Sequence, residues 1–487
     1  MQTSQKHEIF YGSVQTLESY NSSIIQTLES SCSTSNSNPG LSSPSANGSA
    51  ESESGMLKPQ YSLESCLTLT PDLNDLSQKL RELETAMLGP DADISATYDS
   101  DDTAMYEAEK WKKTIEMISR GDMKEMLCAC AYAMVENDME TSEWLMSELR
   151  EMVSVSGNPL QRLGAYLLEA LVARLSSSGS KICKSLKCNE PTSSELLSYM
   201  NTLYEICPYF KFGYLSATGA IADAMKRENR VHIIDFQINQ GIQWVSLIQA
   251  LAFRPGGPPE IRITGVDDSI SAFTRGGGLE IVGKRLSALA QSCNVPFQFH
   301  AVEVSSSDVH LQHLELLPGE GIAVNFTMML HHLQDQTIER LLRLVSCLRP
   351  KVVTLVEQES ETNHVPFFPR FVQTMNYYLP VFESIDDVMP RDNRYRINVE
   401  QHCLAREIVN LIACEGEDRV ERHETLETWK SRFRMAGFSP YPLSSFINFT
   451  IKNLLEGYSR NYTLQEKDGA LYLGWMNQPL VASCAWR

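Results

Sequence analysis

The chain has 487 residues and a formal charge of −19, with 42 Lys and Arg against 61 Asp and Glu. A surface this acidic repels phosphate backbones, so the composition disfavours tight, unaided binding to DNA or RNA. The N-terminus lacks the apolar core of a secretory signal, and no run approaches the ~18 apolar residues of a membrane span, so we expect a soluble intracellular protein with no membrane contact.

Residues 1–106 differ in composition from the rest of the chain. Residues 1–50 contain 14 serines and few apolar side chains, and residues 1–105 hold 15 acidic against 4 basic residues. Such a segment cannot bury enough apolar surface to offset the entropy of ordering. We therefore expect a disordered, serine-rich and acidic tail.

One segment of this tail, residues 71–88, has a helical pattern that ends at Gly89-Pro90. Its apolar side chains recur at three- and four-residue steps. They are Leu73, Leu76, Leu80, Leu83 and Met87. Either an amphipathic helix folds onto a partner here, with Leu73, Leu76, Leu80 and Leu83 as the binding residues, or it docks on the chain's own core.

Residues 107–225 predict a leucine-rich helical cap. An apolar stripe begins near Trp111, breaks at 157–159 and continues to Leu175. A helix-bundle core is favoured over a coiled-coil dimer because the heptad is never sustained.

From residue 226 to 487 the pattern changes to strands that alternate with helices. Five strands that read as buried on both faces are predicted at 231–236, 261–266, 297–302, 321–326 and 352–356. Their spacing leaves room for crossover helices, which indicates a doubly wound, mostly parallel sheet in an α/β fold. Further strands are expected at 382–385, 470–473 and 481–485, the last two as an antiparallel hairpin.

Asp235 ends the first strand, at the position where doubly wound sheets usually bind ligands. A nucleotide-binding loop here carries glycines at alternate positions, but this chain has Gln237 and Asn239, and only Gly241 fits. Asp267 ends the second strand, where an acidic residue receives ribose hydroxyls in related folds.

These residues outline a vestigial nucleoside pocket made of Asp235, Gly241, Asp267, Gly276, Gly277 and Gly278. Because the glycines after Asp235 are missing, we predict no cofactor. The alternative is structural: Asp235 caps the next helix and Asp267 caps its own turn.

No catalytic residue is predicted. His331-His332 and the acidic residues 357, 359 and 361 follow the fourth and fifth strands, and we interpret them as solvated or hydrogen-bonded rim residues. The 12 cysteines lack zinc spacing, so no metal site is predicted. No serine-nucleophile elbow, phosphate-binding loop or HExxH helix occurs, so we expect no enzyme.

Residues 419–438 read as a charged helix and its exit. Arg419 and Arg422 lie three apart on one predicted face, which suits ion pairs across a groove or a dimer interface. They are candidate partner-binding residues. The alternative is a solvated surface helix.

Residues 107–487 resemble the plant GRAS family. Val231-His232-Ile233-Ile234-Asp235 matches its VHIID motif letter for letter, and 107–225 and 275–345 correspond to its two leucine-rich regions. The PFYRE region corresponds to Pro366, Phe367, Tyr377, Tyr378, Arg406 and Glu407, and the SAW region to Trp475, Ser483, Ala485 and Trp486. The strings at 204–212 and 396–403 are similar to the scarecrow-like branch of phytochrome A signal transduction.

The resemblance implies one GRAS domain over 107–487, a Rossmann or methyltransferase-like α/β core under a helical cap. It further implies a transcriptional regulator of nucleus and cytoplasm, in light or stress signalling, with no cofactor. Its partners would be other transcription factors, signalling proteins or a second GRAS protein, with DNA contacted directly or through a partner. Two alternatives remain: a ligand sensor or enzyme that uses the pocket, and a cytoplasmic scaffold, since no strong basic import signal occurs.

Overall fold

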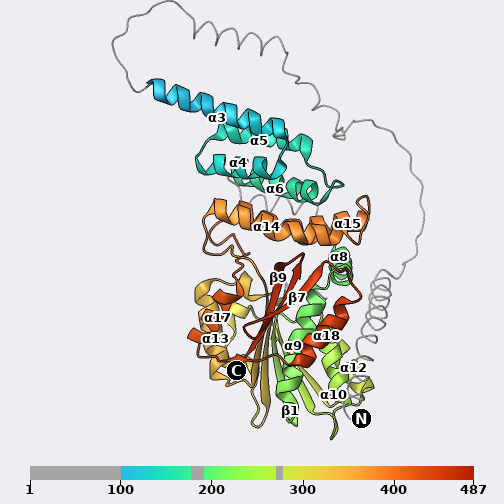
Figure 1. Ribbon diagram of the computed structural model, residues 1–487. Coiled ribbons are helices and arrows are strands. Elements are labelled where there is room, and N and C mark those ends of the chain that lie inside the picture. Colours follow the sequence, from blue (N-terminus) through green and yellow to red (C-terminus); the bar gives the residue numbers. More distant parts are fainter. Residues whose placement is uncertain (1–99, 177–190, 270–277) are drawn as a thin grey trace, which may run out of the picture. The chain divides into compact units, whose positions relative to one another are not determined.

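The computed structural model describes residues 100–176, 191–269 and 278–487 (Figure 1). The chain divides into two compact units, and of the smaller, Ser33–Glu116, only part of α3 (Ser100–Arg120) is described. The helix predicted at 71–88, with Leu73, Leu76, Leu80 and Leu83, lies outside the described residues, as do Gly276 and Gly277. The larger unit includes Met117–Arg487.

Among the described residues, one sheet has the strand order β3-β2-β1-β4-β5-β9-β8-β7, and β6 pairs with β9. The strands are β1 (Arg230–Phe236), β2 (Glu260–Val266), β3 (Phe297–Val302), β4 (Gly321–Thr327), β5 (Val352–Gln358), β6 (Pro440–Tyr441), β7 (Tyr462–Lys467), β8 (Ala470–Trp475) and β9 (Gln478–Trp486). The first five are parallel and the last group is antiparallel. The predicted strands at 231, 261, 297, 321 and 352 and the C-terminal hairpin are confirmed.

Residues on opposite faces of β1, β4, β5, β8 and β9 belong to two separate apolar cores, as expected of a sheet covered on both faces. Val231 and Ile233 of β1 join one core, whereas Ile234 and Phe236 join the other. Helices α9 (Tyr209–Met225), α10 (Ile242–Ala252), α12 (Leu279–Ser292) and α18 (Ser445–Leu455) contribute to the first core, and α13 (Asp335–Cys347) and α17 (Leu426–Met435) contribute to the second. The two helix groups flank the sheet in Figure 1.

A helical cap is built from two stretches of sequence. It consists of α4 (Met123–Val135), α5 (Met139–Met152), α6 (Pro159–Leu175), α14 (Phe367–Asp386) and α16 (Ala405–Ala413), with α8 (Ser193–Ile206), α15 (Arg394–Val399) and η5 (Glu400–Leu404) beside them. The leucine-rich stretch at 107–225 therefore supplies only half of the cap. Its last helix, α9, packs on β4, β5 and β9 instead, where a Cβ on Gly213 would lie 2.7 Å from Val356.

The strand expected at 382–385 is wrong, because these residues form the last turn of α14. Phe382 and Ile385 are both buried and lie three apart, a spacing that places them on one face of a helix. In a short apolar run, periodicity does not separate a strand from a buried helix.

A buried ion cluster fastens the cap. The Arg162 side chain of α6 is 0% exposed, and it donates to Glu400 at 3.1 Å and to Asp386 at 2.6 Å. Arg396 of α15 also pairs with Glu400. Burial raises the pKa of Glu400 to about 7, against the opposing effect of the two guanidinium groups. The cluster joins α6 to α14 and η5.

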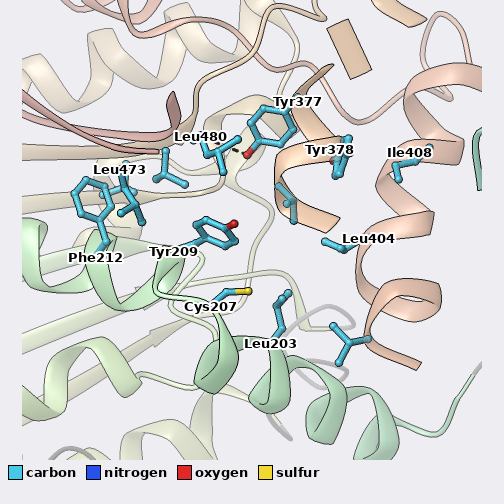
Figure 2. Close-up of a cluster of buried hydrophobic side chains, with 14 of the residues drawn as sticks. Leu203, Cys207, Tyr209, Phe212, Tyr377, Tyr378, Leu404, Ile408, Leu473 and Leu480 are labelled. Carbon is cyan, nitrogen blue, oxygen red and sulfur yellow. Dashed lines mark hydrogen bonds between the residues drawn. The ribbon is translucent and has the colours of Figure 1, made fainter. Parts of the chain in front are cut away.

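The cap and the sheet meet in an apolar junction (Figure 2). Leu203, Cys207 and Tyr209 face Tyr377 and Tyr378 of α14, with side chains of η5, α16, β8 and β9 around them. The Tyr377 hydroxyl donates to the backbone oxygen of Leu480 at 3.1 Å, and the Tyr209 and Ser384 hydroxyls lie 2.7 Å apart. The described cysteines are free thiols, and Cys207 is buried. No helix within the described ranges is long and apolar enough to cross a bilayer.

Candidate functional site

The strand order reverses between β1 and β4, and ligands of doubly wound folds bind at the carboxyl ends of the strands at this point. Asp235 of β1 stands beside Asn325 of β4 in the sheet register. Both side chains are buried, and Asp235 is 3% exposed. Asp235, the first residue of the vestigial pocket predicted from the sequence, therefore lies at this switch point.

Side chains of the protein itself surround Asp235. Its carboxylate accepts hydrogen bonds from the Trp244 indole and the Asn325 amide, each at 2.8 Å. Asn325 in turn pairs with the Gln243 amide at 3.3 Å and accepts from the Thr354 hydroxyl at 2.8 Å. Burial raises the pKa of Asp235 to about 7, while these two donors oppose the shift. Hydrogen bonds within the chain thus engage the Asp235 carboxylate.

The prediction that Asp235 caps the following helix is wrong. Helix α10 begins after Gly241, which occupies the N-cap position without a side-chain hydrogen bond. The Asp235 carboxylate instead accepts from two side chains, the Trp244 indole in the first turn of α10 and the Asn325 amide of β4. It does not cap the backbone N–H groups of α10.

The loop after β1 keeps an alternating left-handed backbone. Gln237, Asn239 and Gly241 have φ values of 70°, 51° and 69°. Positive φ is the conformation for which glycine is usually chosen, and other residues adopt it at a cost of about 1 kcal/mol. Gly241 is also required by space, since a Cβ there would lie 2.9 Å from Val282 of α12. The loop therefore has the backbone conformation of a glycine-rich loop, but Gln237 and Asn239 stand at two of the positions where glycine is usual.

Asp267 follows β2 and is buried, with its backbone N–H donating to the Val302 oxygen at 3.2 Å. Its charge acts on Asp235, so the structure brings the two predicted acidic residues together. Gly278 precedes α12 with a φ of 100°. Of the predicted pocket glycines that the structure describes, Gly241 packs against α12 and Gly278 precedes that helix.

A second polar cluster lies at the carboxyl ends of β4 and β5. Glu357 accepts from the His331 ring at 2.5 Å and from the backbone N–H groups of Met329 and Leu330 at 3.1 and 2.8 Å. Burial alone would raise the pKa of Glu357, but His331 and the backbone donors hold it below its usual value. The predicted rim position of His331 and Glu357 is confirmed. Of the two interpretations, that of hydrogen-bonded rim residues is confirmed and that of solvated rim residues is wrong, because both side chains are buried and bonded to each other.

The buried cluster extends to the loop before α17. The Glu421 carboxylate lies 3.4 Å from the nearest ring nitrogens of His331, His332 and His423. Next to it, the Tyr378 hydroxyl donates to Glu407 at 2.6 Å, and burial raises the pKa of Glu407. Sequence reasoning missed Glu421, His423 and Glu407 as neighbours of His331, since nothing in their spacing links them.

The charged helix predicted from residue 419 is wrong at its start. Residues 419–425 form a loop, and α17 begins at Leu426. The backbone N–H of Leu426 donates to the Glu359 carboxylate at 2.9 Å. Arg419 donates to the backbone oxygens of Thr362 and Asn363 at 2.6 and 3.0 Å. Arg422 is buried and donates to a backbone oxygen at 2.8 Å. These guanidinium groups hold the loop in place and do not share a helix face.

The remaining motif residues take structural positions. Val231 to Asp235 are β1, in which His232 bonds the Thr264 hydroxyl at 2.7 Å. Pro366 precedes α14, which carries Phe367, Tyr377 and Tyr378, while α16 carries the exposed Arg406 as well as Glu407. In β8 and β9, the aromatic rings of Trp475 and Trp486 are buried, as are Ser483 and Ala485. The Ser483 and Ser216 hydroxyls lie 2.7 Å apart and join β9 to α9.

Comparison with known proteins decides the family. The GRAS domain family matches residues 123–487. The chain belongs to the GRAS domain family. It is 62% identical over 431 residues to Scarecrow-like transcription factor PAT1 of Arabidopsis thaliana, covering 86% of this chain and 88% of that protein. It is 59% identical over 430 residues to chitin-inducible gibberellin-responsive protein 2 of Oryza sativa subsp. japonica, covering 87% and 78%.

A solved GRAS structure confirms the fold. SCL7 of Oryza sativa superposes with a TM-score of 0.68 at 34% identity, over 75% of this chain and 99% of that one. The predicted α/β fold with a helical cap and the predicted family resemblance are both confirmed.

Proposed function

We propose that this GRAS chain is a transcriptional regulator that works through contacts with other regulatory proteins and catalyses no reaction. Family membership and the similarity to Scarecrow-like transcription factor PAT1 support a regulatory role. Regulation of transcription places its work in the nucleus. We further propose a cytoplasmic pool, as expected of a regulator that responds to a signal.

The environment of Asp235 is the observation that supports the proposal that the chain catalyses no reaction. Trp244 and Asn325 donate to the carboxylate oxygens to which a ribose hydroxyl or an amino group of a ligand would otherwise donate. Gln237 and Asn239 place side chains where a phosphate-binding loop has none. A fold does not determine a function, and this site supports a scaffold better than a cofactor enzyme.

We propose that DNA is reached mainly through a partner. The formal charge of −19 opposes phosphate binding, and a protein that contacts phosphates directly loses affinity steeply with salt. Binding of the purified full chain to promoter DNA, measured across a salt series, separates the two routes. We expect no binding at low salt without a partner, whereas binding that falls steeply with salt would establish direct contact.

For partner contact, we propose the segment at 71–88, with Leu73, Leu76, Leu80 and Leu83 as its apolar face. Arg419 and Arg422 are less suited, because their side chains bond backbone oxygens of this chain. A homodimer or a heterodimer with another GRAS protein is a further candidate complex. The upstream signal proposed for this chain is light, from its similarity to the scarecrow-like branch, or stress.

Reporter output in plant cells tests the proposal. The full chain, and the chain without residues 1–105, are each tethered to an unrelated DNA-binding domain. We expect the full chain to change transcription and removal of the tail to reduce the effect. No change with either version would contradict a regulatory role.

A further inference from the structure

His331, His332, His423 and Glu421 converge from two distant parts of the sequence. His331 and His332 belong to η4 (Leu330–His332) after β4, whereas Glu421 and His423 lie on the loop before α17. The ring centroid of His331 lies 4.1 Å from that of His332 and 4.8 Å from that of His423. One ligand atom each of His331, His332 and Glu421 fits within a 4.8 Å span.

The distances match a metal site better than a hydrogen-bonded one. Three imidazole nitrogens each lie 3.4 Å from a Glu421 oxygen, beyond the usual length of an N–H···O bond. Donor atoms about 2.05 Å from a tetrahedral zinc ion lie about 3.3 Å from one another. Glu421 therefore stands from each imidazole at about the separation of two neighbouring zinc ligands, while the 4.8 Å span holds His331, His332 and Glu421.

His423 supplies an independent observation. Its side chain is 1% exposed, and neither ring nitrogen has a hydrogen-bond partner among the described residues. Oε2 of Glu421, which lies 3.4 Å from Nε2 of His423, also has no hydrogen-bond partner among the described residues. A buried imidazole without a partner is costly, and coordination of a cation would satisfy it.

Surrounding contacts fix the geometry of the cluster. Glu357 accepts from Nδ1 of His331, which leaves Nε2 as the free ligand atom, as in carboxylate–histidine–zinc arrangements. The backbone N–H of Arg422 donates to the His331 oxygen at 2.9 Å, and that of His423 donates to the Thr362 hydroxyl at 2.9 Å. The two segments are therefore held together beside the proposed ion.

The charges also suit a divalent cation. Glu357 and Glu421 are both buried, and their ion pairs are with imidazoles alone within the described ranges. Two buried carboxylates require compensating charge, which one divalent ion would supply. His332 is 35% exposed at its side chain and gives an ion a route from solvent.

A second His/Asp/Glu cluster shows the opposite case. Asp335, His364 and Glu424 also fit within 4.8 Å, but the Arg432 guanidinium donates to Asp335 at 2.5 Å and to Glu424 at 2.6 Å. A cation already occupies the middle of this group, so it serves as an internal control.

We propose that His331, His332, His423 and Glu421 bind one Zn²⁺ ion, which joins the end of β4 to the loop before α17. Imidazole nitrogens together with a carboxylate favour zinc over magnesium or calcium. Four protein ligands leave no open position, so the ion is structural. This departs from the expectation of no metal, which rested on cysteine spacing and on treating the histidines as rim residues.

Metal analysis of the purified full chain, followed by replacement with Co²⁺, tests the proposal directly. We expect one equivalent of zinc, or uptake of one equivalent by chelator-treated protein, and an intense visible Co²⁺ spectrum of tetrahedral type. Absence of stoichiometric uptake, or a weak octahedral spectrum, would overturn it.

Three variants place the site. His332→Ala, at the most exposed ligand, is expected to weaken Zn²⁺ binding by at least ~100-fold, and His364→Ala is expected to leave it unchanged. Glu357→Gln is expected to weaken binding by ~10–100-fold through loss of orientation of His331. Equal Zn²⁺ affinity of His332→Ala and the unmodified chain would overturn the assignment. If His332→Ala does not fold, the Co²⁺ spectrum of the unmodified chain still decides it.

Discussion

The two polar clusters at the carboxyl edge of the sheet differ in how their buried groups are paired. At the switch point, the Asp235 carboxylate and the Asn325 amide are engaged by hydrogen bonds of 2.8 to 3.3 Å within the chain. At the histidine cluster, three imidazoles stand 3.4 Å from Glu421, and neither ring nitrogen of His423 has a hydrogen-bond partner within the described residues. The Asp235 carboxylate therefore finds its hydrogen-bond partners within the chain, whereas the histidine cluster is the one for which we propose a ligand.

The comparison bears on the proposed non-enzymatic role of this doubly wound fold. Trp244 of α10 and Asn325 of β4 donate hydrogen bonds to the Asp235 carboxylate, so these buried contacts stabilise the fold. Other ionisable side chains lie further along the same edge of the sheet, at His331 after β4 and at Glu421 on the loop before α17. The loop after β1 is thus not suited to a cofactor, but the carboxyl edge of the sheet still carries side chains that could bind a metal ion.

The largest expected effect comes from opening the switch point. Asn325→Ala removes one donor to Asp235 and the acceptor of Thr354, leaving both buried groups short of partners. We expect the free energy of unfolding to fall by about 3 kcal/mol or more. Chemical denaturation measures it, with Asn448→Ala, which loses an exposed bond to Glu466, as a control expected to change stability by about 0.5 kcal/mol. Equal losses in both variants would contradict the account of the switch point.

A matched pair of tryptophans isolates one hydrogen bond. Trp244→Phe removes the indole donor to Asp235, whereas Trp429→Phe removes an indole N–H with no hydrogen-bond partner among the described residues. Both rings are buried, so both variants lose a similar volume. We expect Trp244→Phe to destabilise the chain by about 2 kcal/mol more than Trp429→Phe. Thermal or denaturant unfolding checks the difference, and its absence would show that Asp235 does not depend on the indole.

The protonation of Asp235 gives a pH-dependent prediction. Its pKa is raised by burial to about 7 in the folded chain and is about 4 when unfolded, so the folded chain keeps a proton that the unfolded chain releases between these values. This group therefore contributes stability that is present below about pH 4 and lost as the pH rises through about 7. Asp235→Asn is expected to remove up to about 1.4 kcal/mol per pH unit from the slope in that window. Denaturation at several pH values, with an unchanged slope in the variant, would contradict it.

The smallest expected effect sharpens the contrast with the histidine cluster. In the presence of a chelator, His332→Ala should cost less than about 1 kcal/mol, because the ring is partly exposed and its contact with Glu421 is 3.4 Å long. With Zn²⁺ added, the unmodified chain should gain stability that the variant does not gain. A loss in chelator as large as that of Asn325→Ala would mean that both clusters are complete without a ligand.

The sequence predicted the sheet better than the cap, for a physical reason. Runs such as 231–236 and 352–356 are apolar on both faces and bounded by polar turns, which defines buried strands. Strand β7, with the sequence YTLQEK, is half-exposed at the sheet edge and lacks that signal. The cap combines α6 with α14 and α16, and the contact of Arg162 with Glu400 spans 238 residues that no local pattern connects.

The candidate site was predictable only in part. Asp235 was placed correctly because it ends an apolar strand. Its partner Asn325 lies within another apolar strand, and the two meet only through the order β1-β4, which the strand signals do not specify. Arg419 and Arg422 have helical spacing, but tertiary hydrogen bonds to backbone oxygens hold them in a loop instead.

Equilibrium binding of S-adenosylmethionine and nucleotides to the purified full chain tests the central claim most directly, since that claim is that the chain's own side chains complete the cofactor position. Isothermal titration should give no saturable heat at millimolar ligand, with the thermal midpoint unchanged. Saturable one-to-one binding that raises the midpoint would contradict the account and identify the chain as a ligand sensor or an enzyme.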